Sequence, residues 1–460
     1  RLMNNANAQL DIYSLKKRFF DSKEFKFVCI SILLFTIFIL IISPPWRILN
    51  FDEVDYFNAS RKGLWVNAFD SSSLGIKNFL SLAFWKLKLI SVPPKFFEYN
   101  ESFDTFLLRH FHPPLLQYIS SYFAFVPKED FNTAEKLVFL VRWGLGCIFI
   151  ISSYSISGSL FNLKKKNLYF LVKVFFISYS ALLLSLYLQY HLLIAILLLF
   201  TCNSFMNLLK NPIKINFLIF SVTLAFSIIS LETTLFSIII LTIIYVSINF
   251  NQGISIYKLF RKVLIYFWFL PFIFSLILWP AALFKLSIFK SYGMYAYRLF
   301  FIKTEYEGVF NFERFTPILA VLLVYIALLA LSVIFIKNAN LLKFNEKNPY
   351  KIFFIFGISY TTCMLPFSLF HTYMLPGLFL ATLPVLELLN YDNVQKSLFK
   401  FSIILLSICI SFGFFQLNNK GFYEYFFAGF PGKKSLNNIT QISTKKNLNI
   451  YSDAGNILEF

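Results

Sequence analysis

FVCISILLFTIFILIISPPW, residues 27–46, is the stretch that decides the fold class of this chain. It holds no charged side chain, and as a helix its 20 residues would cross the hydrocarbon core of a bilayer, which is about 30 Å thick. A basic segment precedes it, and no small-residue cleavage site follows it. The stretch therefore predicts a membrane-spanning helix that is retained in the protein.

The composition of the whole chain agrees with this stretch. Of 460 residues, 58% are hydrophobic and only 14% are charged, whereas about a quarter of a soluble domain is charged. These values exclude a soluble enzyme, a disordered chain and a disulfide scaffold. The net charge of +19 comes from Lys and Arg scattered between apolar segments rather than gathered on one patch. Nucleic acid is therefore not an expected partner. The chain is instead expected to be a polytopic membrane protein in contact with lipids.

Apolar stretches of similar length recur along the chain. The predicted spans are 27–46, 138–160, 168–186, 189–208, 215–231, 234–250, 263–283, 316–336, 352–370, 374–390 and 401–415. One further run, PPLLQYISSYFAFVP (113–127), is short for a span and opens with two prolines, so it could instead lie at the membrane interface.

The distribution of positive charge favours the arrangement in which 113–127 does not cross. The segments on one side then carry 20 Lys and Arg residues, and the short loops on the other side carry 5. By the positive-inside rule the first side is cytoplasmic. We therefore expect an all-α polytopic protein with about eleven transmembrane helices. Its predicted parts are a cytoplasmic N-terminus (1–26), a transmembrane domain (27–415) with a long first outer loop (47–137), and a small C-terminal outer segment (416–460).

The first outer loop carries the most informative polar residues. Its segment GIKNFLSLAFWKLKLISV (75–92) mixes aromatic and basic residues, as an interfacial helix does. Asp52, Glu53 and Asp55 follow the first span directly. Low dielectric and mutual repulsion raise the proton affinity of such acids, which suits a general base. A divalent metal ion bound by Asp52 and Glu53 is the competing use, and a solvated turn is the simplest one.

Other titratable groups fall on the same predicted side. His110 and His112 follow Arg109 and precede two prolines, which fix an extended backbone. Such a cationic cluster suits a phosphate group, either of a substrate or of a lipid headgroup. His191 and Glu232 lie at the ends of predicted spans, where ionisable residues are costly and often functional.

Taken together, these motifs resemble those of the C-type (GT-C) glycosyltransferases. The relevant residues are Asp52-Glu53 with the following Tyr56, then His112-Pro-Pro-Leu115, Arg142 at the start of the second span, and His371-Thr-Tyr-Met-Leu-Pro376 late in the chain. The pattern is similar to the protein O-mannosyltransferase and lipid A aminoarabinose transferase families. The motif matches cover about forty residues, while the expected topology is similar over most of the chain.

The resemblance implies a concrete chemistry. Such enzymes move a sugar from a polyprenyl-phosphate donor to a hydroxyl of a lipid, glycan or protein acceptor on the outer or lumenal face. Asp52 would be the catalytic base and Glu53 would position it, while Arg109, His112 and Arg142 would hold the lipid phosphate. The residues expected at the substrate site are Asp55, Tyr56, Arg109, His110, His112, Arg142, Gln189, His191, Glu232 and Tyr373. A bacterial inner membrane fits this resemblance, as does an endoplasmic reticulum in a eukaryote.

The chain departs from the family pattern in three places. Gln189 and His191 occupy the region where many relatives have a second acid, and Glu232 lies where a basic residue is commoner. The Trp-Trp-Asp signature of oligosaccharyltransferases is absent from the sequence, so transfer of an entire oligosaccharide to Asn is not expected.

Two other functions remain open at this point. A polytopic transporter or lipid flippase predicts repeated halves, broken helices and ionisable residues at the membrane midplane. The sequence shows no internal repeat, and its polar residues gather at one face. A non-catalytic relative that kept the scaffold is the third alternative, against which the intact Asp52-Glu53 pair argues.

Overall fold

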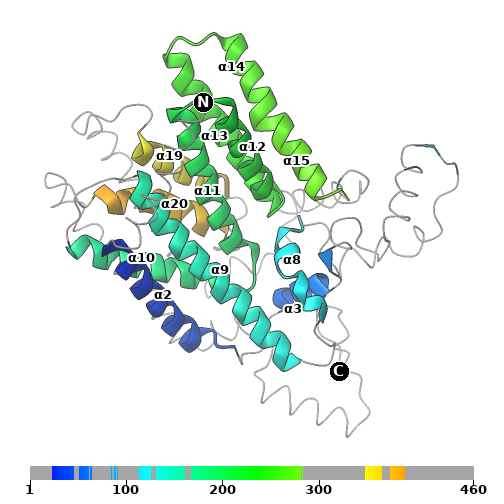
Figure 1. Ribbon diagram of the computed structural model, residues 1–460, viewed down its shortest axis with the longest axis vertical. Coiled ribbons are helices and arrows are strands. Elements are labelled where there is room, and N and C mark those ends of the chain that lie inside the picture. The colour runs from blue at the N-terminus through cyan, green and yellow to red at the C-terminus, as the bar shows by residue number, and fades with distance from the viewer. Residues whose placement is uncertain are drawn as a thin grey trace, which may run out of the picture.

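The computed structural model describes the helical core of the chain. The described residues are 23–45, 51–61, 63–64, 84, 88–89, 91, 113–125, 131–160, 167–280, 282, 348–364 and 373–388. All regular secondary structure within these residues is helical (Figure 1). The all-α expectation is therefore confirmed for this part of the chain.

Most of the described helices coincide with predicted spans. The longer helices are α2 (Lys23–Ile42), α3 (Phe51–Arg61), α9 (Phe131–Leu160), α10 (Asn167–Ser185), α11 (Tyr190–Lys210), α12 (Lys214–Ile228), α13 (Leu235–Asn251), α19 (Pro349–Met364) and α20 (Leu375–Leu388). A continuous helical stretch from Ile256 to Leu278 comprises α14 (Ile256–Val263), the π-helical η3 (Leu264–Phe269) and α15 (Leu270–Leu278). Short elements are α8 (Leu115–Ile119), η1 (Ser121–Phe125) and η2 (Glu232–Thr234).

The structure supports a membrane protein but does not confirm eleven spans. Within the described residues, four helices are long and apolar enough to cross a bilayer: Phe25–Ile42, Thr133–Leu160, Tyr190–Lys210 and Ile256–Leu278. Shorter apolar helices are Leu171–Ser185, Lys214–Ile228, Leu235–Asn251 and Leu375–Leu386. The predicted spans 316–336 and 401–415 and the terminal segments 1–22 and 416–460 lie outside the described residues, as does most of the expected interfacial helix 75–92.

The run 113–127 does not form a long helix. Its described part folds as α8 and η1, each of five residues, and a backbone break at Ser120 separates them. Five helical residues span about 7.5 Å, far less than a bilayer core. Both short helices pack against α3, so this segment and the acid-bearing segment form one layer at the end of the bundle (Figure 1).

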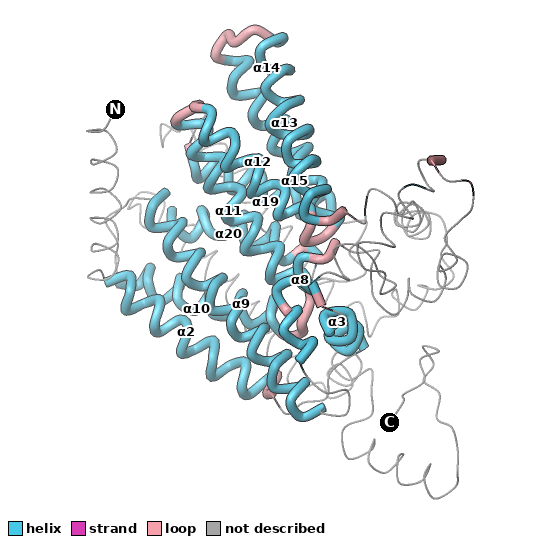
Figure 2. Tube along the Cα trace, turned by 45° about the vertical axis from the view of Figure 1, so that its right-hand side comes forward, coloured by secondary structure: helices cyan, strands magenta, loops and turns pink. Residues whose placement is uncertain are grey.

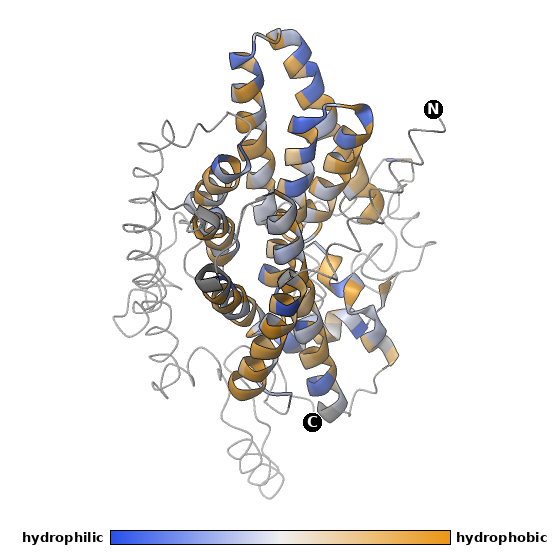
Figure 3. Cartoon of the chain, turned by 60° about the vertical axis from the view of Figure 1, so that its left-hand side comes forward, coloured by the Kyte–Doolittle hydropathy of each residue, from blue (hydrophilic) through white to orange (hydrophobic). Residues whose placement is uncertain are grey.

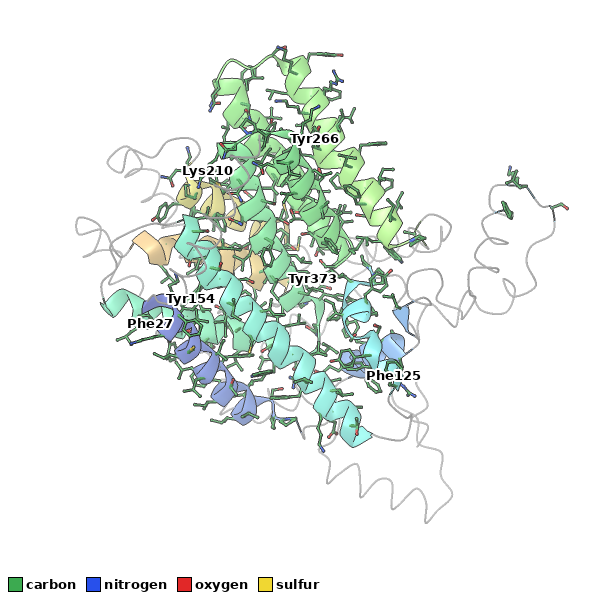
Figure 4. The ribbon with its side chains drawn as sticks, in the orientation of Figure 1. Phe27, Phe125, Tyr154, Lys210, Tyr266 and Tyr373 are labelled. Atoms are coloured by element: carbon green, nitrogen blue, oxygen red, sulfur yellow. The ribbon has the colours of Figure 1, made fainter. Side chains whose placement is uncertain are left out.

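The helices α2, α9 and α10 pack against one another and share a buried polar layer. Ser31 of α2 is hydrogen-bonded to the Tyr154 hydroxyl of α9 at 2.9 Å. The Lys173 ammonium of α10 is buried, donates to Ser157 Oγ at 2.5 Å and lies 5.1 Å from the centre of the Tyr154 ring. Tyr154 and Phe27 mark this region in Figure 4. These contacts fix one end of the three-helix group.

The central helix of the bundle is α11. Most of its residues are buried, and it contacts α9, α12 and α20. An apolar helix that is buried on nearly all sides has other helices rather than lipid or solvent as its neighbours. The first residues of α11 therefore lie inside the bundle, and polar side chains there must find partners within the protein.

The long helix from Ile256 to Leu278 changes its hydrogen-bonding pattern in the middle. Pro271 lacks an N–H, and its ring crowds the carbonyl four residues earlier, so the helix widens into η3 just before it. Ser221 of α12 donates to the Tyr266 carbonyl at 2.7 Å, and Ser275 donates to the Ala225 carbonyl at 3.4 Å. These two bonds fix α12 beside this helix.

The bundle has two distinct ends. Figure 2 shows the turns α11–α12 and α13–α14 at one end, and α3 and α8 toward the other. Lys210 lies at the first end and Phe125 at the second (Figure 4). In Figure 3 apolar residues follow most of the helix lengths, and hydrophilic residues gather toward the uppermost turn, α13–α14. The predicted site residues that the structure describes belong to the end with α3 and α8.

Candidate functional site

The acid motif lies on helix α3, which begins a few residues after α2 ends. Ser43, Pro44 and Pro45 end α2, and prolines at that point cannot continue a helix. Helix α3 then presents Glu53 and Tyr56, three residues apart, on its buried face. The backbone of Asp52 and Asp55 is part of the same helix, and their side chains lie outside the described part of the structure.

Glu53 ties α3 to the connection between α10 and α11. Its side chain is fully buried, and Oε1 accepts a hydrogen bond of 2.8 Å from the Leu188 amide. The same oxygen lies 3.8 Å from Arg142 Nε. A buried carboxylate needs a counter-charge and hydrogen-bond donors, and Glu53 has both. These contacts fix the Glu53 side chain, and the expectation that Glu53 positions Asp52 stays a prediction.

Arg142 is a buried link between helix ends. It lies well inside α9, which starts at Phe131, seven residues before the predicted span 138–160. Its Nη1 donates to Ser43 Oγ and to the Leu186 carbonyl, both at 2.6 Å, and Nη2 donates to the Ser43 carbonyl at 3.1 Å. Carbonyls at helix C-termini carry partial negative charge, so a guanidinium stabilises them. These contacts favour a positioning role over an exposed phosphate ligand.

Aromatic side chains from α3, from α11 and from the segment before α20 meet near the start of α11. The Tyr56 ring of α3 lies edge-on to Tyr190, with centroids 5.0 Å apart. The buried His191 ring lies edge-on to Tyr373, with ring centroids 4.6 Å apart. Tyr373 precedes α20 and is labelled in Figure 4. Gln117 of α8 donates through Nε2 to the Tyr190 hydroxyl at 2.7 Å. The predicted residues Tyr56, His191 and Tyr373, far apart in sequence, are thus brought to one region.

Helix α8 is also joined to the other helices by two hydrogen bonds. The Leu115 amide donates to the Ile229 carbonyl at 3.0 Å, which ties α8 to the connection that contains η2. The Tyr118 hydroxyl donates to the Leu278 carbonyl at 2.6 Å. Burial raises the pKa of Tyr118 above its ordinary value, so the phenol stays protonated and remains a donor. These bonds hold α8 between the ends of α12 and α15.

Several predicted residues cannot be placed at this region. Arg109, His110 and His112 lie outside the described residues, and so does His371. Glu232 belongs to η2, but its side chain is not described. Gln189 is described, and it occupies the extended position just before α11, where it is half-buried.

The surroundings of Glu53 do not suit a metal ion. Its Oε1 accepts a hydrogen bond from the Leu188 amide and lies 3.8 Å from the positively charged Arg142 guanidinium, which would repel a cation. A metal site shared between Asp52 and Glu53 is therefore not favoured by these contacts. Among the described residues there is no group of three or more His, Cys, Asp or Glu side chains that could hold a metal.

Sequence reasoning missed Gln117 and Ser43. Gln117 is the single strongly polar residue within the apolar run LLQYI, directly after two prolines, and that isolation was an available signal. Ser43 carries no such signal, because a serine after an apolar helix is common and its role depends on Arg142, which is 99 residues away.

Comparison of the chain with family models, with curated proteins and with solved structures finds no match.

Proposed function

We propose that this chain is a membrane glycosyltransferase that moves a sugar from a polyprenyl-phosphate donor to a hydroxyl acceptor on the extracytoplasmic face. The observation that carries the proposal is the anchoring of α3. A buried ion pair and an amide hydrogen bond hold this acid-bearing helix against the ends of α2, α9 and α10. Catalytic groups act best when they are held rigidly relative to the substrate.

In this mechanism Asp52 is the general base. It would accept the proton of the acceptor hydroxyl while that oxygen attacks the anomeric carbon of the donor sugar. The bond between this carbon and the phosphate oxygen breaks, and the polyprenyl phosphate leaves with the bonding electrons. Glu53 acts as a positioning residue, because its carboxylate is already engaged by Leu188 and Arg142. The two neighbouring acids therefore have separate roles.

The departing phosphate requires cations. In the transition state a positive sugar ring separates from a negative phosphate, so fixed cations on the phosphate side lower the barrier. We assign this role to Arg109 and His112. Arg can bind a phosphate with two parallel hydrogen bonds. Arg142 supports the same site indirectly, since it holds Glu53 and the ends of α2 and α10.

One observation favours the transporter alternative. A π-helical segment interrupts the helix from Ile256 to Leu278, and irregular helices within a bundle are typical of transport sites. However, the Tyr266 carbonyl in this segment accepts a hydrogen bond from Ser221, and Pro271 accounts for the irregularity. The segment therefore serves packing between α12 and α15, and a transferase remains the better proposal.

The test is the substitution Asp52→Asn in the purified full-length protein. We expect transfer from polyprenyl-phosphate hexoses to drop by roughly 10²- to 10⁴-fold, the usual contribution of a general base. Binding of the donor should be retained, because the amide is isosteric with the carboxylate. Asn58→Asp, on the same helix, is the control for a general effect of changing charge on α3. Near-normal turnover by Asp52→Asn would exclude Asp52 as the base.

A further inference from the structure

Two buried side chains, Gln117 of α8 and Thr233 of η2, each carry one polar atom that has no hydrogen-bond partner among the described residues. Gln117 is 1% exposed and Thr233 is 5% exposed, and neither Gln117 Oε1 nor Thr233 Oγ1 has a hydrogen-bond partner there. Buried polar atoms are nearly always hydrogen-bonded, because leaving water without a new partner is unfavourable. Each of these two atoms therefore requires an explanation.

Their polar neighbours in sequence are paired within the chain. Ser120, at the end of α8, donates to the Leu116 carbonyl and shares a hydrogen bond of 2.6 Å with Ser60. The Thr234 hydroxyl lies 2.7 Å from the carbonyls of Ser227 and Leu231. The lack of a partner is therefore particular to Gln117 and Thr233, and is not a general property of these two segments.

The two segments are held together and are fixed in place. The hydrogen bond from the Leu115 amide to the Ile229 carbonyl joins α8 to the connection before η2. Gln117 lies two residues after the donor, and Thr233 lies four residues after the acceptor. The other end of the Gln117 amide is bound to the Tyr190 hydroxyl at 2.7 Å, so the side chain cannot turn freely. Its free oxygen is thus presented from a rigid support.

The chemistry of these atoms selects the kind of ligand. An amide oxygen accepts hydrogen bonds only, so it repels the oxygens of a phosphate, whereas a threonine hydroxyl both donates and accepts. A sugar offers several hydroxyls that can satisfy both groups. The Tyr190 hydroxyl that binds the Gln117 amide belongs to a ring that packs edge-on against Tyr56.

We propose that Gln117 and Thr233 form a subsite for the hydroxyls of the donor sugar. Gln117 Oε1 accepts a hydrogen bond from one hydroxyl, and Thr233 Oγ1 exchanges a hydrogen bond with another. This inference rests on the proposed glycosyltransferase function and adds to it the residues that distinguish a sugar from its lipid carrier. It assigns the phosphate to another part of the site.

The experiment compares two ligands on the purified full-length protein. One is a short-chain polyprenyl phosphate, and the other is the same lipid carrying mannose, glucose or galactose on the phosphate. The readout is the ratio of the two dissociation constants. We expect Gln117→Met and Thr233→Val to weaken binding of the preferred glycosylated lipid roughly tenfold, the net effect of one hydrogen bond, with little change for the sugar-free lipid.

Matched controls and the outcomes separate this inference from the proposed function. Ser120→Ala and Thr234→Val remove hydroxyls that bond within the chain, so the ratio should stay at its wild-type value. An unchanged ratio in Gln117→Met and Thr233→Val would overturn the subsite. A loss of stability without a change in the ratio would do the same, because it would mean that the two atoms bind a trapped water rather than a sugar. If Gln117→Met does not fold, Thr233→Val decides the question. If wild-type protein binds neither lipid, the proposed function fails as well.

Discussion

At the residue scale, Arg142 shows how a charge is kept inside an apolar bundle. Its guanidinium is 2% exposed and is bound by Ser43, by the Leu186 carbonyl and by Glu53. Burying an ion is unfavourable unless a counter-charge and hydrogen bonds replace water. Because each partner of Arg142 comes from a different segment, satisfying this charge also joins α2, α3, α9 and the end of α10.

The coupling between Glu53 and Arg142 can be measured with a double-mutant cycle. We expect Arg142→Met or Glu53→Ala alone to lower the free energy of unfolding by about 3–5 kcal/mol, because each leaves a buried charge without its partner. Together they should cost at least about 1 kcal/mol less than their sum, as is usual for residues in contact. Thermal unfolding in detergent provides the comparison.

Two conservative substitutions make the test of the Glu53–Arg142 coupling more specific. Glu53→Gln keeps an oxygen that can accept from the Leu188 amide, so it should be milder than Glu53→Ala. Arg142→Lys should rescue little, since one ammonium cannot reproduce the fork that reaches both Ser43 and Leu186. Additive effects of the single changes, within about 0.5 kcal/mol, would show that the two side chains are not coupled.

The sequence identified only part of the site, for reasons visible in single residues. Acids directly after an apolar span stand out, so Asp52 and Glu53 could be chosen from composition and place alone. Their different roles could not, because the pairing of Glu53 with Arg142 joins residues 89 positions apart through helix packing. Gln117 is similar, since only the structure shows which end of its amide is paired.

At the element scale, hydropathy located helices well but not their ends. The helix α9 extends back to Phe131, because residues 131–137 are polar enough to leave a membrane yet still form a helix. Hydropathy marks where a helix can contact lipid and does not mark where the helix starts. The division of 113–127 into α8 and η1 was equally invisible, because the apolar content continues across the break at Ser120.

Helices α19 and α20 show a close contact that does have a sequence signature. Gly357 and Thr361 on α19 face Gly377 and Ala381 on α20, and each pair has the four-residue spacing typical of tightly packed membrane helices. A Cβ at Gly357 would collide with the backbone of Gly377 and Ala381. Phe379 of α20 in turn packs on Phe149 and Phe176, which extends this contact to α9 and α10.

Gly357→Ala is therefore expected to destabilise the protein by about 1–3 kcal/mol, the usual cost of overpacking, because a backbone neighbour must move. Gly144→Ala on α9 is the matched control, since a Cβ there meets no atom within 4 Å. Alanine is the better helix former, so the control should be neutral or slightly stabilising. Thermal unfolding of both variants in the same detergent checks this. Equal stability of the two variants would contradict the close packing of α19 on α20.

At the scale of the whole molecule, basic turns lie at one end of the bundle and the acid-bearing helix α3 lies toward the other. The turns α11–α12 and α13–α14 lie at one end, and Lys210, Lys214 and Lys258 lie on or beside them (Figure 2). The helix α3, with its acids, and α8 lie toward the other end. The charge pattern predicts that the first end is cytoplasmic. A site at the second end would then meet lipid-linked donors and acceptors at the outer surface.

This arrangement makes two separate predictions about topology. Because the turns at Pro212 and Gly253 lie at the same end of the structure, single cysteines placed there must be labelled from the same side of the membrane, whichever side that is. The bias of 20 against 5 Lys and Arg residues further predicts that this side is the cytoplasm. A reporter placed after Lys164 should lie on the same side. We expect a membrane-impermeant maleimide to label these positions in inverted vesicles and not in intact cells, and to label Asn418 with the opposite preference.

Labelling of Pro212 and Gly253 from opposite sides would refute the helix arrangement. Labelling of both, and of Lys164, from outside would leave the arrangement intact but reverse its orientation, and α3 with Asp52 would then face the cytoplasm, where the proposed reaction could not reach acceptors at the outer surface.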